Sequence, residues 1–480
     1  MCHDAVVMQL RHERCNLADV FVLSLLTLAA LLLLAFAARG QAVSIPDPEL
    51  QSLIRRHLDK PVGEITTVDM ESLTELYAEG LGTTSFEGLG AAHNLRRIQF
   101  NGCSSATDPE VVCNLLPQLV LPEGLYHLTT IDVAFNAITN VYLPPDLTNL
   151  TSLSLTANLV HDLTFLSNAP SISFLDLDFN GLERLILPFN VTNLTVLGLA
   201  HNPMREFELS PTLNKLQHLS FFWGNLERLT LPPNLDNLVS LNLYGNKLTQ
   251  LTIPVGLRHL SEINAQRNQI TNVVLPGDLG SVNLYLGVNR LTDLSFLAGQ
   301  SKLVALDIAN NDLENLLLPS GLHNLRDLSA FGSSVKSIQL PRDLLQLNRL
   351  ELSFNQLTEI SLTVPLPALT YLGLDHNPLS EFRVPAGMRA LYPLVENLRA
   401  AGARVTLWPV LTAPNKADDG SFSFNVAADA GSLDIYRSQN LQDWIHIGSL
   451  DVPRPNELPA SFRDSEHTGG TAWFYSVRQR

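Results

Sequence analysis

One sequence frame, L-x-x-L-x-L-x-x-N, recurs along most of the chain and limits what the chain can fold into. Its ten intact copies place asparagine at Asn136, Asn158, Asn180, Asn202, Asn246, Asn268, Asn289, Asn311, Asn355 and Asn377. We call this position the asparagine slot; Gly224 and Ser333 occupy it in two further copies. Neighbouring slots are 22 residues apart, except for the 21 residues from Asn268 to Asn289. A fixed period of this length predicts a solenoid, in which each repeat forms one turn of a coil.

Two weaker copies precede the intact ones and extend the predicted coil to about fourteen turns over residues 73–385. They place Leu81 and Cys103 in the slot, and an 11-residue insertion, residues 104–114, follows the second. The composition, with 45% hydrophobic and 16% charged residues, suits turns that share one continuous leucine core.

Within each repeat, the L-x-L alternation predicts a strand of about three residues with its leucines on one face. Because every turn returns to the same side, these strands are expected to stack into one parallel sheet. The slot asparagine is expected to face inward and to bond backbone groups, which is a structural role.

The return leg of each repeat begins after the slot, as in "KLTQLTIP", residues 247–254. Leu248, Leu251 and Ile253 are expected in the core, and Pro254 prevents a long helix. A second, shorter strand is therefore predicted in the return leg. The legs after Asn158 and Asn289 have another pattern and predict a mixed outer wall.

The stretch "LVSLNLYGNKLTQLTIPVGLRHL" resembles a leucine-rich repeat, and residues 45–76 resemble the helical N-terminal cap of secreted bacterial internalin-like proteins. The resemblance implies an α/β-type solenoid, mostly β: a leucine-rich repeat horseshoe with a parallel concave sheet and helical caps. Such proteins bind other macromolecules through the concave sheet. The slot residues Leu81, Cys103, Gly224 and Ser333 depart from the pattern.

The predicted domains are residues 1–42, an export signal; 43–72, an N-terminal helical cap; 73–385, the repeats; 386–405, a C-terminal cap helix; 406–415, a linker; and 416–480, a small β-sandwich. The apolar run from Val20 to Ala38 follows Arg11 and Arg14, which is typical of a cleaved signal, although it is also long enough for a membrane anchor.

The C-terminal segment alternates short strand patterns with turn residues and resembles immunoglobulin-like or fibronectin-like modules. That resemblance rests on its strand pattern and on Tyr436, Trp444, Phe474 and Tyr475.

Only two of the four cysteines, Cys103 and Cys113, lie outside the export segment. In an oxidising compartment they either form a disulfide across the insertion or remain two thiols, and the sequence leaves both open. No second Cys or His pair completes a zinc pattern.

The stretch "DLDFNGLE", Asp176 to Glu183, matches the start of a calcium loop, but Leu187 replaces the carboxylate needed at the twelfth place. His201 and His376 occupy matching "HNP" triplets eight turns apart, without a nucleophile to pair with either. No metal, cofactor or catalytic activity is therefore expected. The net charge of −16 disfavours nucleic acid as a partner.

Residues beside the strand leucines are the expected ligand-binding residues of the concave face, because the leucines themselves are needed for the core. The candidates are Asp132, Asp176, Asp178, Phe222, Asn242, Tyr244, Asn264, Gln266, Tyr285 and Asp307. Aromatic and amide side chains together suit a protein anchor or a glycan, whereas a solvated face with scattered aromatics would bind neither. The acids favour a basic partner.

These observations predict an exported, non-enzymatic recognition protein that binds a protein partner, secreted or at the cell envelope outside the cytoplasm. A glycan-binding adhesin is the alternative. A third hypothesis, an accessory to a secreted hydrolase, requires Trp444 to be exposed rather than buried in the C-terminal module. Membrane contact is expected only if the N-terminal segment is retained.

Overall fold

The computed structural model describes residues 40–79, 82–102, 116–277, 279–362, 366–386, 388–418, 421–428, 431–439, 441–452, 460–464 and 474–479. The chain divides into two units, residues 1–172 and 173–480, and each is described by itself. The apolar run of the expected export signal, Leu81, Cys103, Cys113 and the insertion all lie outside the described residues.

The first unit begins with a cap of two helices, α2 (Pro48–His57) and α3 (Thr67–Glu71). The carboxylate of Asp47 accepts the N–H of Leu50, which caps α2, and also the N–H of Thr84 in the first return leg, each at 2.8 Å. One buried acid therefore joins the cap to the coil. In α3, Thr66 and Asp69 form a reciprocal capping box.

Four parallel strands follow in this unit: β1 (Glu75–Glu79), β2 (Arg97–Asn101), β4 (Thr130–Asp132) and β6 (Ser152–Ser154). The return legs contain the parallel pair β3 (Gln118–Val120) and β5 (Asn140–Tyr142), and the 3-10 helices η1 (Leu89–Ala91) and η2 (Thr164–Asn168).

The second unit repeats the same arrangement along a longer parallel sheet. Its strands are β7 (Phe174–Asp176), β8 (Val196–Gly198), β10 (His218–Ser220), β12 (Ser240–Asn242), β14 (Glu262–Asn264), β16 (Val282–Tyr285), β17 (Leu303–Asp307), β19 (Asp327–Ser329), β21 (Arg349–Glu351) and β23 (Tyr371–Gly373). Leucine pairs with leucine across strands, as Leu219 does with Leu241. The single 21-residue step appears as the pairing of Glu262 with Asn283.

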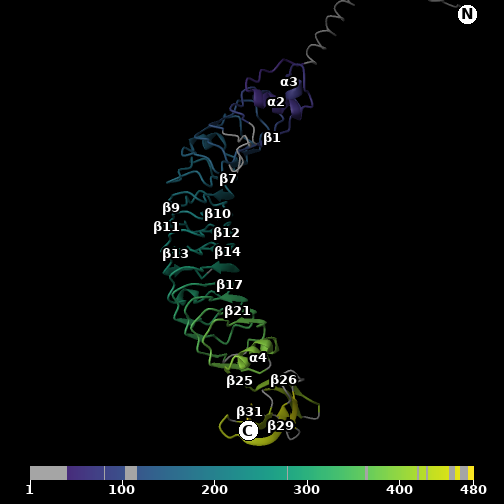
Figure 1. Ribbon diagram of the computed structural model, residues 1–480, viewed down its shortest axis with the longest axis vertical. Helices are drawn as coiled ribbons and strands as arrows, with labels where there is room; N and C mark the ends of the chain where they lie inside the picture. The colour runs from purple at the N-terminus through teal and green to yellow at the C-terminus, as the bar shows by residue number, and fades with distance from the viewer. Residues whose placement is uncertain are drawn as a thin grey trace, which may run out of the picture. The chain divides into compact units, whose positions relative to one another are not determined.

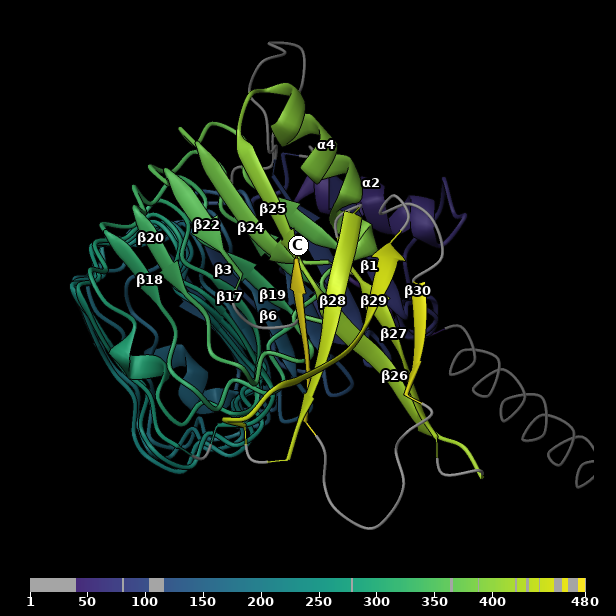
Figure 2. The ribbon, with the colours of Figure 1, turned by 90° about the horizontal axis from the view of Figure 1, so that it is seen from below.

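The outer wall of the second unit lies across the core from this sheet. In Figure 1, β9, β11 and β13 lie opposite β10, β12 and β14. In Figure 2, β18, β20 and β22 lie opposite β17 and β19. The strands of the outer wall are β9 (Glu206–Glu208), β11 (Arg228–Thr230), β13 (Gln250–Thr252), β15 (Asn272–Val274), β18 (Asn315–Leu317), β20 (Ser337–Gln339), β22 (Glu359–Ser361), β24 (Glu381–Pro385) and β25 (Arg404–Trp408). The leg after Asn289 instead forms η3 (Ser295–Leu297), so the wall is mixed. Leu248, Leu251 and Ile253 are fully buried between the two walls.

The helix α4 (Tyr392–Ala400), which η4 (Arg389–Leu391) precedes, lies in the segment expected as the C-terminal cap. Residues 406–415, for which we expected a linker, lie mostly in strands instead. β25 continues to Trp408, because its backbone pairs in parallel with β24 up to Pro385, and a new strand begins at Val410.

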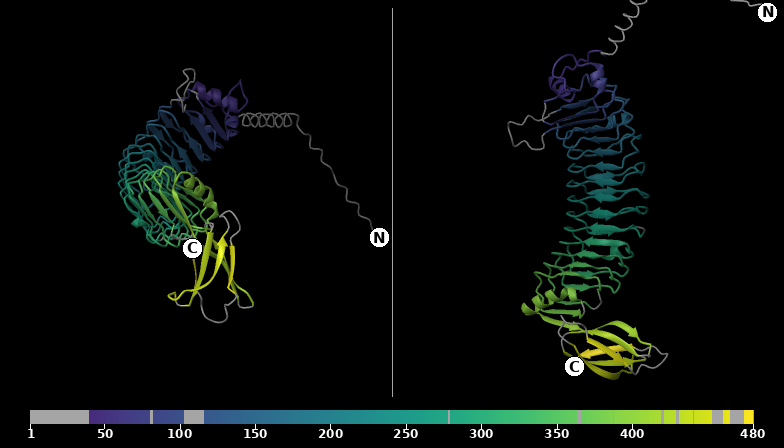
Figure 3. Two further views of the ribbon diagram at one scale, coloured as in Figure 1. Left: turned by 60° about the horizontal axis from the view of Figure 1, so that its bottom comes forward. Right: turned by 90° about the vertical axis from the view of Figure 1, so that its right-hand side faces the viewer.

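The C-terminal module consists of two three-stranded antiparallel sheets that share a core (Figure 3). One contains β26 (Val410–Lys416), β27 (Phe422–Ala427) and β30 (Ala460–Asp464), and the other β28 (Gly431–Ser438), β29 (Ile445–Val452) and β31 (Phe474–Gln479). Phe424, Val426, Leu433 and Ile435 form the centre of the core. Trp444 lies outside this core cluster and is half-buried.

None of the helices in the described ranges is long and apolar enough to span a membrane.

Candidate interaction surface

The parallel sheet has one side that faces solvent, and we call this side the open face. In most of its strands the central leucine or isoleucine is buried while the residues on either side are partly exposed, as in β12, where Leu241 lies between Ser240 and Asn242. Each of the ten candidates from the sequence directly follows a buried apolar residue, and all ten are partly exposed or exposed. Asp132 belongs to the first unit and the other nine belong to the second.

The five Asp and Asn candidates that lie within strands share a structural task that the sequence analysis missed. Each side chain accepts the backbone N–H two residues later: Asp132 from Ala134, Asp176 from Asp178, Asn242 from Tyr244, Asn264 from Gln266 and Asp307 from Ala309, at 2.9 to 3.4 Å. Glu351 does the same for Ser353 at 2.9 Å. The signal was an Asp, Asn or Glu at the end of a strand, where such side chains bond nearby backbone.

The most perturbed group of the open face is Asp178. It lies beside Asp176, and both carboxylates lean over Gly198 of the next strand, where an added Cβ would lie 2.8 Å and 3.0 Å from their Oδ1 atoms. Burial, and then the charge of Asp176, raise the pKa of Asp178 to about 6, although the N–H of Ala200 donates to it at 2.6 Å. Gly198 thus leaves the space that the acid pair fills.

A second polar group lies at the middle of the open face. The amide of Gln266 donates to Asp307 across an intervening turn at 2.6 Å. Tyr285 comes from that intervening turn, and its pKa is raised by burial and by the charges of Glu262, Asp307 and Asp327. These residues are therefore brought together, but Gln266 and Asp307 already bond each other.

The asparagine slot lies directly beneath this surface. The amide of Asn246 donates to the carbonyls of Phe221, Leu243 and Tyr244 and accepts the N–H of Leu226, at 2.6 to 3.4 Å. The other intact slots of the second unit repeat this scheme. Ser333 keeps part of it, bonding Ile308 and Asn311, whereas Gly224 has no side chain to do so.

The residue just before each slot forms a column that we call the rim: Phe135, Ala157, Phe179, His201, Trp223, Gly245, Arg267, Val288, Asn310, Gly332, Phe354 and His376. All twelve have a left-handed backbone, with φ between +52° and +72°. This conformation is uncommon for residues with side chains, but it lets each N–H reach the next turn, as Trp223 does to Tyr244. The sequence analysis considered His201 and His376 in this column only as catalytic candidates. The signal for the shared conformation was the glycine and asparagine at three rim positions.

The first aromatic ladder crosses the rim and the open face in the first turns of the second unit. The ring of His201 stacks on Phe179, with centroids 3.8 Å apart and planes at 12°. Phe222 meets the edge of His201 and stacks on Tyr244 at 5.3 Å. Trp223 contacts Tyr244 edge to face and lies over Gly245, where a Cβ would be 2.9 Å from the indole.

A second aromatic ladder lies further along the same unit. Phe354 stacks on His376 with centroids 3.9 Å apart and planes at 13°, and it also contacts Phe331 at 4.9 Å. Phe354 is half exposed. Nearby, Glu351 is buried and already accepts bonds from Arg349 and Tyr371.

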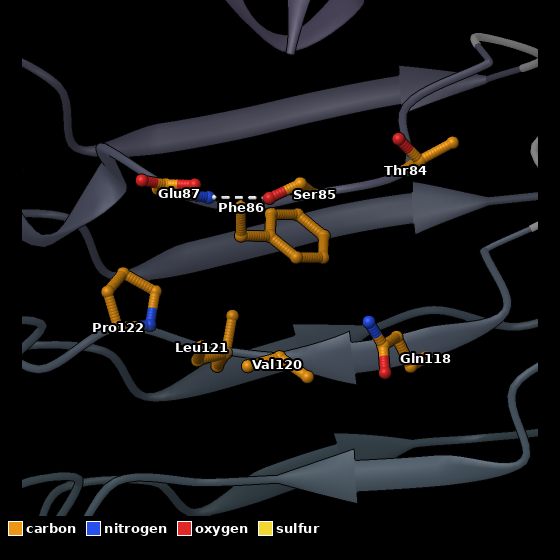
Figure 4. A pocket seen from close by; sticks show the side chains of 8 residues that line it. All are labelled: Thr84, Ser85, Phe86, Glu87, Gln118, Val120, Leu121 and Pro122. Carbon is orange, nitrogen blue, oxygen red and sulfur yellow. Dashed lines mark hydrogen bonds between the residues drawn. The ribbon is translucent and has the colours of Figure 1, made fainter. Parts of the chain in front are cut away.

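Several hollows lie among the return legs, with volumes from about 210 to 610 Å³. The pocket in Figure 4 has a volume of about 280 Å³ and lies in the first unit, between the return leg at Thr84 to Glu87 and β3. The hydroxyl of Ser85 accepts the N–H of Glu87 there at 3.1 Å. The pocket contains no pair of titratable groups suited to acid–base chemistry.

One cluster in the C-terminal module contains the residue types of a hydrolase triad. Ser449 donates to Asp434 at 2.7 Å, and Nε2 of His446 is 3.3 Å from the same carboxylate oxygen and 3.5 Å from the serine. In a triad the two histidine nitrogens contact different partners. Here one nitrogen faces both, and the cluster is exposed. In the described ranges, no group of three or more His, Cys, Asp or Glu residues is placed to hold a metal ion.

Comparisons with known proteins agree with this architecture. Residues 198–297 match the family model for the BspA type leucine rich repeat region in six copies. The functional domain of InlJ from Listeria monocytogenes, which includes a cysteine ladder, is similar in structure, with a TM-score of 0.54 and 19% identity, over 80% of this chain and 96% of that one. In this chain Cys103 is the single cysteine in the slot column.

Other solved structures are similar at lower scores. The internalin InlF from Listeria monocytogenes has a TM-score of 0.41 at 23% identity, over 63% of this chain and 93% of that one. The Toll–Spätzle complex of Drosophila has a TM-score of 0.47 at 20% identity, over 70% of this chain and 54% of that one. No curated protein matches the sequence. The predicted leucine-rich repeat solenoid is confirmed.

Proposed function

We propose that this leucine-rich repeat protein is an exported, non-enzymatic recognition protein that binds a protein partner through the open face and the adjoining rim. The open face corresponds to the concave face expected from the sequence. The binding residues are the first aromatic ladder and the polar side chains beside it, with Phe222, Trp223 and Tyr244 at the centre.

The packing of partly exposed aromatic rings against one another is the observation that carries this proposal. A glycan is bound by a sugar ring lying flat on an aromatic face. In the first ladder Phe179 and His201 each cover one face of the other, and Phe222 and Tyr244 pack with their ring centroids 5.3 Å apart. Phe179, Phe222 and Trp223 remain 50%, 36% and 44% exposed. These rings form a partly exposed apolar strip that suits the side chains of a protein.

The fold supports the same conclusion. Leucine-rich repeat proteins of the internalin type are protein-interaction modules, and the fold is typically a non-enzymatic scaffold. The Toll structure named above was determined with its protein partner Spätzle. An extracellular or surface location agrees with the apolar run from Val20 to Ala38, which is the basis for export in this proposal.

Among the described residues of the C-terminal module, the half-buried Trp444 and the partly exposed Asp434, His446 and Ser449 do not form a substrate site. We therefore assign it the role of a spacer or a second contact. A bond between Cys103 and Cys113 remains a prediction.

The test is parallel binding of the purified chain to an array of extracellular proteins and to an array of defined glycans. The variant replaces Phe222 and Tyr244 with alanine, and the control replaces the exposed outer-wall residues Arg228 and Thr252 with alanine. We expect a protein to bind the unchanged chain and the control but not the variant. Glycan binding that the variant loses would establish the adhesin alternative instead, and protein binding that the variant retains would place the site elsewhere.

A further inference from the structure

We propose that the rim carries two matched subsites, one on Phe179 and His201 and one on Phe354 and His376, each of which binds a lysine or arginine side chain of the protein partner. This inference rests on the proposed function, because it names the chemistry of the partner segment. It goes further by assigning a second site, in the second ladder, and a stoichiometry of two.

The two subsites are alike in geometry. Each is a Phe and a His from successive rim positions, stacked at 3.8 Å and 12° in one case and at 3.9 Å and 13° in the other. All four residues have the left-handed rim backbone, with φ from +54° to +59°. The flat contact covers one face of each ring, and Phe179 and Phe354 remain half exposed.

An acid accompanies each stack at the neighbouring position of the open face. Asp178, which also accepts the N–H of Ala200, directly precedes Phe179 in the first stack, whereas the exposed Asp375 directly precedes His376 in the second. A half-exposed aromatic ring beside a carboxylate matches a long cationic side chain, whose aliphatic stem packs on rings while its charged head meets the acid. Glu351, the other acid near the second subsite, is already bonded to Arg349 and Tyr371. The charge complementarity of both subsites is therefore with a basic segment.

The excess of acidic over basic residues, 47 against 31, favours the approach of such a segment. The subsites lie eight turns apart, which is on the order of 40 Å along a sheet with strands about 4.8 Å apart. A short peptide occupies one subsite at a time, so two copies bind per chain. A longer basic partner reaches both and gains affinity because the second contact is intramolecular.

The rim itself provides variants that keep the fold. Ala157 and Val288 occupy rim positions with φ of 54° and 58°, so alanine is accommodated there without added backbone strain. Val288 is 42% exposed and lies between the two subsites in sequence, which makes Val288→Ala the matched control.

The experiment titrates the full chain with a six-residue peptide of alternating arginine and leucine, blocked at both ends, by isothermal titration calorimetry. We expect two sites per chain, one site after Phe179→Ala or Phe354→Ala, none after both changes, and two after Val288→Ala. Asp375→Asn should weaken the second site about tenfold, since it removes the charge and keeps the shape. A peptide with glutamate in place of arginine should not bind.

Absence of binding, equal binding of the glutamate peptide, or two sites retained by the double variant would each overturn the proposal. These outcomes are separate from the protein and glycan arrays. A protein bound through Phe222 and Tyr244 would still support the proposed function if both subsites failed.

Discussion

The asparagine slot and the rim are neighbours in sequence, yet they differ in almost every physical respect. Slot residues are buried and mostly identical, because each amide bonds backbone atoms of two turns. Rim residues share only a backbone conformation, and their side chains range from glycine to tryptophan. One position therefore holds the coil together, while the next can change its chemistry without changing the fold.

Asn310 and Asn311 allow this difference to be tested with one residue type in one turn, and here we expect the largest effect. The amide of Asn311 bonds Leu286, Ile308 and Leu291 at 2.9 to 3.0 Å, and the side chain is buried. Asn311→Ala leaves several buried backbone groups unpaired, which should lower the free energy of unfolding by about 2–4 kcal/mol. Asn310→Ala should lower it by less than about 1 kcal/mol, because the side chain is exposed. Urea denaturation measures both, and equal losses would contradict the distinction.

Gly245 is where the rim itself is constrained, and its replacement should have the next largest effect. It has φ of +72°, and an added Cβ would lie 2.9 Å from the indole of Trp223. Gly245→Ala combines left-handed strain with displacement of that ring, so we expect a loss of about 2 kcal/mol and a shifted tryptophan emission maximum. Gly277→Ala is the control, since no atom lies within 4 Å of its added Cβ. An unshifted emission maximum would mean that the indole does not rest on Gly245.

The same contrast explains what the sequence could predict. The slot, the strand leucines and the return legs follow from spacing alone, because burial demands the same residue type every turn. The rim conformation arises from hydrogen bonds between turns, such as that from His201 to Phe222, and a 22-residue frame does not reveal them. For the same reason the frame predicted Asp176 and Asp307 as free ligand-binding acids, although each carboxylate accepts the backbone N–H two residues later.

Residues 406–415 show another limit of prediction from the sequence. The pairing of β25 with β24 depends on which edge the coil leaves open after its last turn, and composition carries no signal for that. The stacked rings of Phe179 and His201 were also missed, since they are 22 residues apart and each looks like a surface residue on its own.

Replacement of Asp178 tests whether a charge on the open face lowers the free energy of unfolding. The pKa of Asp178 is raised to about 6 by burial and by Asp176, so the folded protein binds a proton more tightly than the unfolded chain. Stability from this group is present at pH 4 and is lost as pH rises through 6. Asp178→Asn should therefore be more stable than the unchanged chain at pH 7.5 by about 1 kcal/mol, after allowance for solvent screening, and not at pH 4. Melting temperatures at both pH values measure this, and a difference that does not depend on pH would remove Asp178 as its source.

Phe354 should show the smallest effect on stability. It is half exposed, and its contacts with Phe331 and His376 are ring contacts at the surface rather than core packing. Phe354→Ala should lower the free energy of unfolding by about 0.5–1 kcal/mol, the range for an exposed aromatic pair. In urea denaturation it should resemble Val288→Ala and differ from Asn311→Ala. A loss comparable to that of Asn311→Ala would show that the second ladder supports the coil. Loss of peptide binding in Phe354→Ala would then reflect lost stability and would not identify Phe354 as a binding residue.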